Sequence, residues 1–314
     1  MPHARDSKLS RRAVLQAGLF AGVGAALAQR GIGAETDTSL PLITKPIPTT
    51  GERLPVVGVG TDSFRSGDFD ELQAVLRRMH ELGGTVIDTA AAYGDSEDII
   101  GRALSRLGVR DRMFVATKLT ASGFFGVAGR ASFEQSLQRL KTDRIDLLQV
   151  HNLNGVDTLM PLLREWKQAG KIRYLGITTS RASQHAEMVD LMRKHPLDFV
   201  QVDYSIANRD AAASVLPVAL ERKIAVLANL PLGRASLIRQ AGARDLPRWA
   251  ADIDVSSWSQ FFLKYVVSHP AVTCAIPGST KVPHLEDNQR AARGRLPDAA
   301  MRERMEEYWE GKGR

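Results

Sequence analysis

Short apolar segments alternate with longer amphipathic segments eight times along this chain. The apolar segments are too short for buried helices, and they are typical of strands that are covered on both faces. We therefore expect strands at 56–60, 85–90, 114–119, 145–151, 172–178, 199–204, 225–230 and 272–278.

The segments between these strands have the apolar spacing of helices. In 71–83, leucine, valine and methionine recur at helical intervals, and the pair Gly83-Gly84 is typical of a helix end. Ser96 looks like a capping residue, followed by an acidic first turn. Helices are expected at 71–83, from 96 onward, and at 132–141, 157–169, 183–194, 212–222, 256–268 and 283–291.

Alternating strands and helices predict a parallel sheet. Eight units in a chain of this length favour an α/β fold of the (β/α)8 TIM barrel type, with an open doubly wound sheet as the alternative. No GxGxxG turn follows the first expected strand, which argues against a Rossmann site. Residues 43–57 form two extended pieces around a Thr-Gly turn, and we expect an N-terminal β-hairpin that closes the barrel floor. The long connection 234–255 is a candidate flap, and the polar segment after Leu296 is assigned to no element.

The first residues are typical of an export signal. Basic residues that include Arg11 and Arg12 precede a short apolar run, which ends in the small-residue cleavage pattern Ala26-Leu27-Ala28. The run is too short to span a bilayer as a helix, and the paired arginines resemble the twin-arginine motif that an export receptor reads.

These features divide the chain into a signal peptide with its leader, 1–34, cleaved after residue 28 or 34, and a single domain, 35–314. We expect the twin-arginine export machinery as a partner, a periplasmic or otherwise exported location, and no stable membrane span after processing. A retained anchor and a buried first helix stay open as alternatives.

Charge and cysteine content exclude other classes of protein. The net charge is +7, but charges of both signs are dispersed, without a basic stripe interleaved with aromatic residues, so nucleic acid binding is not expected. Cys274 is the one cysteine of the chain, which excludes an internal disulfide and a cysteine metal site. It reads as a buried strand residue.

Four ionisable side chains follow the ends of consecutive strands. Asp88 lies at the carboxyl end of the second expected strand, Tyr93 on the loop after it, Lys118 at the carboxyl end of the third strand and His151 at that of the fourth. Active sites of (β/α)8 barrels lie at the carboxyl ends of the strands, so these side chains should converge. Each alone has a structural explanation, as a turn cap, a packed ring, a surface lysine or a core histidine. Together they favour catalysis.

This set of side chains suits the reduction of a carbonyl group. A tyrosine has a usual pKa of about 10, and a cationic Lys118 beside Tyr93 is expected to lower it. Asp88 would keep the lysine charged. Tyr93 then supplies a proton to the carbonyl oxygen while a hydride reaches the carbon, and His151 donates a hydrogen bond that orients the oxygen. None of these steps needs a metal.

The sequence resembles the aldo-keto reductase superfamily. The stretch DTAAAYGDSEDIIGRAL, 88–104, is similar to the family's Asp-Thr-Ala, Tyr-Gly, Glu and Gly segment. The family's later signatures have similar stretches in this chain, in the same order, at 169–180, 198–205, 230–233 and 276–288. The resemblance extends over about 55–291.

The resemblance implies an oxidoreductase that reduces a small aldehyde or ketone with NADP(H), or oxidises the matching alcohol. It implies that Asp88, Tyr93, Lys118 and His151 are catalytic, with Tyr93 as the general acid and base. It also implies cofactor contacts along one rim of the barrel. These are Thr61, Asp88, Thr178, Thr179, Gln201 and Asn229 for the nicotinamide end, Pro231, Leu232, Gly233 and Arg234 for the pyrophosphate, and Pro277, Gly278, Ser279, Lys281, His284, Asp287 and Asn288 for the adenine end.

Some positions depart from the family pattern. Asn229 stands where many members stack an aromatic ring on the nicotinamide, and Gly278 and His284 stand where a lysine and an arginine often bind the 2′-phosphate of NADPH. Lys281 is the cation that we expect to bind this phosphate instead. NADPH is therefore favoured, and NADH stays possible.

Loops on the same rim should form the substrate pocket, an apolar cleft with a few polar groups. The expected lining residues are Phe64, Phe124, Phe125 and Asn152, with packing within the loops as the alternative for the phenylalanines. Two alternatives to a reductase stay open. One is a nicotinamide-binding redox-sensing or regulatory protein with little turnover, and the other is a barrel hydrolase or isomerase without a nicotinamide cofactor.

Overall fold

The computed structural model describes residues 39–120 and 127–312. The expected leader, 1–34, and two expected pocket residues, Phe124 and Phe125, lie outside the described residues. Within the described part of the chain, no helix has the length and apolar character that crossing a membrane requires.

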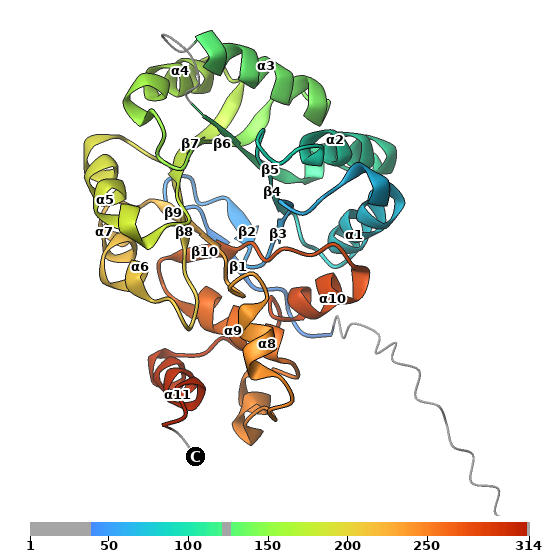
Figure 1. Cartoon of the computed structure of the whole chain (residues 1–314), viewed down its shortest axis with the longest axis vertical. Helices are drawn as coiled ribbons and strands as arrows, with labels where there is room; N and C mark the ends of the chain where they lie inside the picture. The colour runs from blue at the N-terminus through green and yellow to red at the C-terminus, as the bar shows by residue number, and fades with distance from the viewer. Residues whose placement is uncertain (1–38, 121–126, 313–314) are drawn as a thin grey trace, which may run out of the picture. The chain divides into compact units, whose positions relative to one another are not determined.

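Eight parallel strands form one sheet in which neighbours in sequence are neighbours in space (Figure 1). Bridges from Val57 to Ala275 and from Gly60 to Gly278 join the first strand to the last, so the sheet closes into a barrel. This confirms the (β/α)8 prediction over the open sheet. The strands are β3 (Val59–Gly60), β4 (Val86–Asp88), β5 (Phe114–Leu119), β6 (Ile145–His151), β7 (Ile172–Thr178), β8 (Phe199–Asp203), β9 (Ala225–Asn229) and β10 (Val272–Ala275).

Helices surround the barrel (Figure 1). In α1, Leu72, Leu76 and Met79 are buried at helical spacing, and Gly83 takes a left-handed φ of 85° just after the helix ends. The helices are α1 (Phe69–Glu81), α2 (Ser96–Leu107), α3 (Val127–Leu140), α4 (Val156–Gln168), α5 (His185–Lys194), α6 (Asp210–Ala213), α7 (Val215–Glu221), α8 (Ser236–Ala241), α9 (Trp258–Ser268), α10 (Val282–Arg290) and α11 (Ala299–Trp309).

Ser96 does not cap α2, contrary to the expectation from the sequence. It is the first residue of the helix, and its hydroxyl donates to Thr61 Oγ1 at 2.7 Å and accepts from Thr89 Oγ1 at 2.9 Å. Thr61 Oγ1 donates in turn to the carbonyl oxygen of Asp88 at 2.9 Å. These buried hydroxyls therefore hold the carboxyl ends of β3 and β4 together.

An antiparallel hairpin of β1 (Thr44–Pro46) and β2 (Arg53–Pro55) precedes the barrel. Ile47 and Leu54 of this hairpin are buried in one cluster with interior residues from the beginnings of the strands, such as Phe114 and Phe199. The hairpin therefore closes the end of the barrel at which the strands begin, as predicted.

The barrel interior changes from apolar to polar towards the carboxyl ends of the strands. Alternate side chains of a strand face the same side, so an interior residue is followed two positions later by another. The apolar interior residues belong to one buried cluster. In these strands, an apolar residue of the cluster is followed two positions later by a polar residue: Val86 by Asp88, Ala116 by Lys118, Leu147 by Gln149, Phe199 by Gln201, and Leu227 by Asn229.

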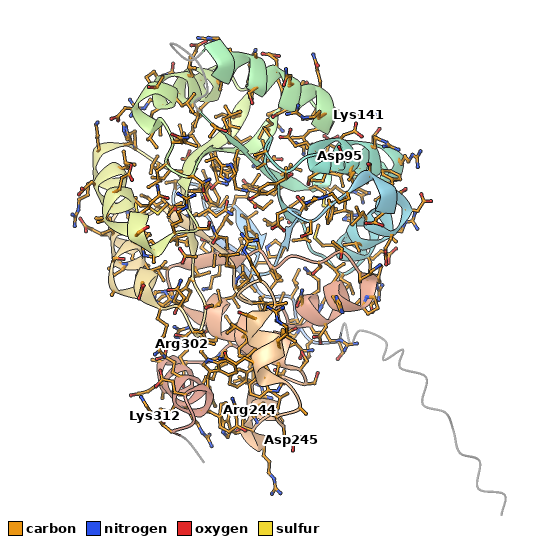
Figure 2. The ribbon with its side chains drawn as sticks, in the orientation of Figure 1. Asp95, Lys141, Arg244, Asp245, Arg302 and Lys312 are labelled. Carbon is orange, nitrogen blue, oxygen red and sulfur yellow. The ribbon has the colours of Figure 1, made fainter. Side chains whose placement is uncertain are left out.

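Two segments contain helices that were not predicted from the sequence. The connection 234–255 holds α8 and a 3-10 helix (Arg248–Ile253), and Leu237 and Ile253 of this segment are buried. Its role as a flap stays a prediction. The polar segment after Leu296 forms α11, whose Trp309 ring packs edge-to-face on Phe262 of α9. Arg302 (Figure 2) fastens this helix, donating to Tyr204 Oη at 2.7 Å.

Candidate active site

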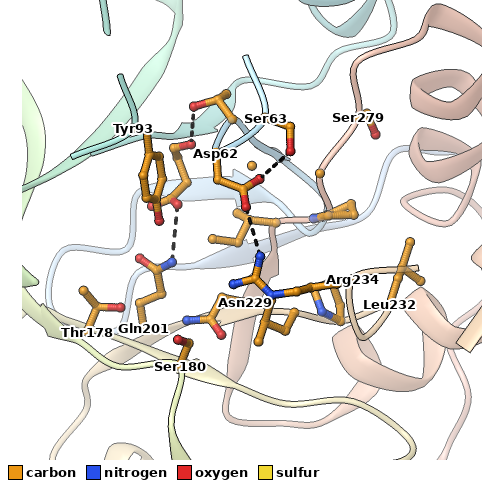
Figure 3. Close-up of a pocket in the computed structure, with 18 of the residues that line it drawn as sticks. Asp62, Ser63, Tyr93, Thr178, Ser180, Gln201, Asn229, Leu232, Arg234 and Ser279 are labelled. Carbon is orange, nitrogen blue, oxygen red and sulfur yellow. Dashed lines mark hydrogen bonds and ion pairs between the residues drawn. The ribbon is translucent and has the colours of Figure 1, made fainter. Parts of the chain in front are cut away.

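A pocket of about 370 Å³ opens at the carboxyl ends of the strands (Figure 3). All four side chains proposed from the sequence as catalytic lie in its wall, together with most of the expected cofactor residues. The predicted residues that line it are Thr61, Asp88, Tyr93, Lys118, His151, Asn152, Thr178, Gln201, Asn229, Pro231, Leu232, Arg234, Pro277, Gly278, Ser279 and His284.

A buried ion pair joins the ends of β4 and β5. Lys118 Nζ donates to Asp88 Oδ2 at 2.7 Å and to the carbonyl oxygen of Thr89 at 2.7 Å. Burial raises the pKa of the Asp88 carboxyl, and the Lys118 ammonium opposes that rise. The carboxylate thus holds the lysine in one position in the pocket wall.

Tyr93 lies directly beside this pair. Lys118 Nζ is 4.9 Å from the centroid of the Tyr93 ring. The pKa of the Tyr93 hydroxyl is nevertheless raised, because burial has a larger effect than the opposing charge of Lys118. The expectation that the pKa of Tyr93 lies below its usual value is therefore wrong for the protein without a bound cofactor. The charge of Lys118 does lower this pKa, as expected, but by less than burial raises it.

His151 packs edge-to-face against Tyr93, with ring centroids 5.9 Å apart and an interplanar angle of 80°. Burial, with a smaller contribution from Lys118, lowers the pKa of His151 to about 4. The imidazole is therefore neutral at neutral pH, and it carries one N–H donor and one acceptor nitrogen.

Two glutamine side chains extend the polar contacts from β4 to β6. Gln201 Nε2 donates to Asp88 Oδ2 at 3.3 Å, and Gln149 Nε2 donates to Gln201 Oε1 at 2.9 Å. Gln149 is not among the residues predicted from the sequence. The period of two along the strand would have found it, because it precedes His151 by two positions and faces the same side.

The pocket also includes residues that the sequence analysis did not single out. Asp62 and Ser63 follow β3, Ser180 follows β7 and Leu230 follows β9. The rule that located the predicted residues, position just after a strand, applies to these as well. Asp62 Oδ2 accepts from Nη1 of Arg234 at 3.2 Å across the pocket (Figure 3).

The pocket rim has unusual backbone geometry. Non-glycine residues with left-handed φ include Asn152 at 54°, Leu230 at 50°, Arg234 at 53° and Ala235 at 63°, and all four line the pocket. Such conformations cost free energy and concentrate at functional sites in proteins.

Asp287 and Asn288 do not line the pocket. Asp287 accepts from Gln260 Nε2 at 2.7 Å, so its carboxylate faces α9. Asn288 donates to Ser279 Oγ at 2.8 Å, and it supports a lining residue from behind. Contacts of these two residues with an adenine ring stay predictions.

Lys281 is exposed and lies outside the pocket wall. Its ammonium pairs with the carboxylate of Glu71 on α1. His284, three positions further along the chain, does line the pocket wall.

The remaining described site residues also lie behind the wall. Thr179 Oγ1 donates to Gln184 Oε1 at 2.6 Å, and Gly233 lies between two lining residues. Phe64 is fully buried in the main hydrophobic core, so its prediction as a pocket residue is wrong. Burying a large apolar ring in the core lowers the free energy of the folded protein relative to leaving it exposed on a loop.

Known proteins resemble this chain in sequence and fold. The sequence model of the aldo/keto reductase family matches residues 56–309. The aldo-keto reductase str7 of Strobilurus tenacellus is 31% identical over 281 residues, which cover 76% of this chain and 82% of that protein. The aldo-keto reductase YhdN of Bacillus subtilis is 36% identical over 200 residues, 58% of this chain and 59% of that protein.

The fold comparison agrees. An aldo/keto reductase of Klebsiella pneumoniae, solved in complex with NADP and acetate, matches with a TM-score of 0.72 and 25% identity, covering 84% of this chain and 94% of that one. The chain belongs to the aldo/keto reductase family.

Proposed function

We propose that this protein uses NADP(H) to reduce a small aldehyde or ketone, or to oxidise the matching alcohol, with Tyr93 as general acid and base. Membership of the aldo/keto reductase family makes the chain an NAD(P)H-dependent oxidoreductase. The complex of the Klebsiella pneumoniae relative with NADP supports this choice of cofactor. The observation that carries the proposal is the convergence of Asp88, Tyr93, Lys118 and His151 in one pocket wall.

The pocket has the chemistry to hold a nicotinamide. Asp88 Oδ1 and Asn229 Oδ1 are buried acceptors that find no donor among the described residues. Buried acceptors without a donor are costly, and a nicotinamide carboxamide offers N–H donors. Thr178, Gln201 and Asn229 would hold this end of the cofactor. When bound, the nicotinamide ring supplies or accepts the hydride.

The pocket wall continues from the nicotinamide end to the segments expected for the phosphates. Leu232 and Arg234 would lie along the pyrophosphate, and Ser279 and His284 would lie near the adenine end. Lys281 would bind the 2′-phosphate in place of its present partner, Glu71. Exposed ion pairs contribute little to stability, so this exchange is easily made.

Each residue of the catalytic set has a separate role. The Tyr93 hydroxyl donates its proton to the carbonyl oxygen during reduction and takes it back during oxidation. Lys118 stabilises the tyrosinate that remains, which matters because burial opposes it. The neutral His151 ring donates a second hydrogen bond to the same oxygen, and Asp88 keeps Lys118 in place.

The function is tested with purified protein and a panel of aldehydes and ketones. Consumption of NADPH with at least one class of carbonyl compound is expected, and it should require the substrate. Tight cofactor binding without turnover on any member of the panel would contradict this proposal and favour a regulatory nicotinamide-binding protein.

The leader suggests where the enzyme works. We propose that 1–34 directs export by the twin-arginine route, so that the barrel folds and binds its cofactor before it crosses the membrane. The basis is the Arg11-Arg12 pair with the short apolar run and the small-residue cleavage pattern.

A further inference from the structure

Gln149 lies inside the barrel, next to the catalytic set but behind the pocket wall. Its side chain is fully buried on β6, and its partner in the β5–β6 pairing is Lys118. Nothing in the carbonyl chemistry described above uses it.

Gly176 gives Gln149 the room to reach its neighbour. In the β6–β7 pairing, Gln149 lies opposite Gly176, which adds no side chain to the interior. A Cβ atom at this glycine would lie 2.6 Å from the carbonyl oxygen of Phe199, so the position cannot easily take a larger residue. The amide of Gln149 therefore crosses β7 and bonds with Gln201 on β8 at 2.9 Å.

The Asp88 carboxylate sets the direction of both amides. A carboxylate only accepts hydrogen bonds, so Gln201 must turn its NH2 group towards Asp88, at 3.3 Å. Its carbonyl oxygen then faces Gln149, which must present an NH2 group in turn. The bond from Gln149 is the shorter of the two, and it is the closer restraint on the Gln201 amide.

Stability alone does not account for a glutamine here. Gln149 Oε1 is buried and finds no donor among the described residues. A buried acceptor without a donor is unfavourable, and an apolar side chain of similar size would avoid that cost. The amide is therefore in place for its NH2 group, which has one acceptor, Gln201 Oε1.

We propose that Gln149 is a positioning residue that holds the Gln201 carboxamide in the orientation that binds the nicotinamide. This inference rests on the proposed function, since it assigns Gln149 to cofactor binding through Gln201. It predicts an effect on the cofactor that exceeds any effect on the proton transfer from Tyr93.

The first experiment compares Gln149→Leu with a matched control, Gln289→Leu. Gln289 is also a buried glutamine, it donates to the carbonyl oxygen of Val57 at 3.3 Å, and its Oε1 likewise finds no donor among the described residues. Dissociation constants for NADPH are measured by fluorescence titration, and kcat is measured at saturating cofactor.

We expect Gln149→Leu to weaken NADPH binding about tenfold, which corresponds to the loss of one good hydrogen bond. Its kcat at saturating cofactor should stay within about threefold of the wild type, and Gln289→Leu should bind NADPH as the wild type does. Unchanged binding by Gln149→Leu, or equal weakening in both variants, overturns the inference. A wild type that binds no nicotinamide cofactor refutes the proposed function instead.

A second variant, Gln149→Glu, tests the donor itself. When protonated, the introduced carboxyl group donates to Gln201 Oε1, and when ionised it cannot. NADPH affinity of this variant should therefore fall as pH rises, more steeply than for the wild type. The wild type is the control for the other titratable groups around the site, Asp88, Tyr93, Lys118 and His151, because both proteins contain them. A profile parallel to the wild type contradicts the inference, and this test stands even if Gln149→Leu does not fold.

Discussion

Lys118 donates to Asp88 at 2.7 Å in a position where the lysine side chain is 1% exposed and the aspartate side chain 4%. A buried pair of this kind depends on both partners, because either charge alone is strongly unfavourable away from water. The structure of the pocket wall therefore depends on the same two residues as its chemistry.

Lys118→Met should destabilise the protein and remove turnover together. Leaving the Asp88 carboxylate without its partner is expected to lower the free energy of unfolding by about 3–5 kcal/mol. Urea denaturation at neutral pH measures it. The control is Arg130→Met, which breaks the exposed pair with Glu165 and should have little effect. Equal stability of Lys118→Met and the wild type would refute the importance of the pair.

His151 makes stability depend on pH. Its pKa is about 4 in the folded protein, below the usual 6.5, so the unfolded chain binds the proton more readily. Its contribution to stability is complete above pH 6.5 and is lost as pH falls towards 4. Replacing His151 with glutamine should flatten the unfolding free energy in this window.

His269 provides the comparison for this measurement. Its pKa is also lowered to about 4, by burial and by Arg302, but it lies outside the active-site pocket. His269→Gln should flatten the same part of the pH profile and leave turnover unchanged. His151→Gln should affect both, and a variant that keeps full turnover would remove His151 from the mechanism.

Much of the site follows from where residues stand relative to the strand ends. Asp88 and His151 end their strands and Lys118 is the last residue but one of its strand, so a correct prediction of the barrel was enough to bring them together. Gln149 was missed because it lies within an apolar-looking strand, and its polarity matters only once Gly176 opens a path to β8.

Other features depend on tertiary burial that a sequence does not state. Phe64 follows a strand as a pocket residue should, yet its ring is buried in the core. The raised pKa of Tyr93 comes from the packing around it, which outweighs the expected effect of Lys118. Residues 299–309 are mostly polar, so no helix was predicted there. The structure forms α11 at this position, and its Met305 and Trp309 pack against the rest of the domain.

Glu71 should control the cofactor preference through Lys281. Glu71→Gln frees the ammonium for the 2′-phosphate, so binding of NADPH should tighten relative to NADH. Lys281→Ala should weaken NADPH by about tenfold, the loss of one charge-assisted bond, and leave NADH unchanged. Competitive titration of both cofactors measures the ratio. If neither substitution changes it, Lys281 does not bind the phosphate.

The export proposal is tested by replacing Arg11 and Arg12 with lysine together. Holo-protein, folded and carrying cofactor, should then accumulate in the cytoplasm, and cell fractionation followed by mass spectrometry of the bound cofactor detects it. Continued export of unfolded, cofactor-free chains would show that another route reads this leader.

The most direct test of the central claim is the turnover of Tyr93→Phe. This variant keeps the ring beside Lys118 and His151 and loses only the hydroxyl that we propose as the proton donor. Its control is Tyr174→Phe, which removes another hydroxyl, one that donates to Glu52 at the barrel floor. The account predicts that Tyr93→Phe lowers kcat by about 10²–10⁴-fold, with NADPH binding retained, while Tyr174→Phe keeps full turnover. Turnover of Tyr93→Phe at the wild-type rate would contradict the account.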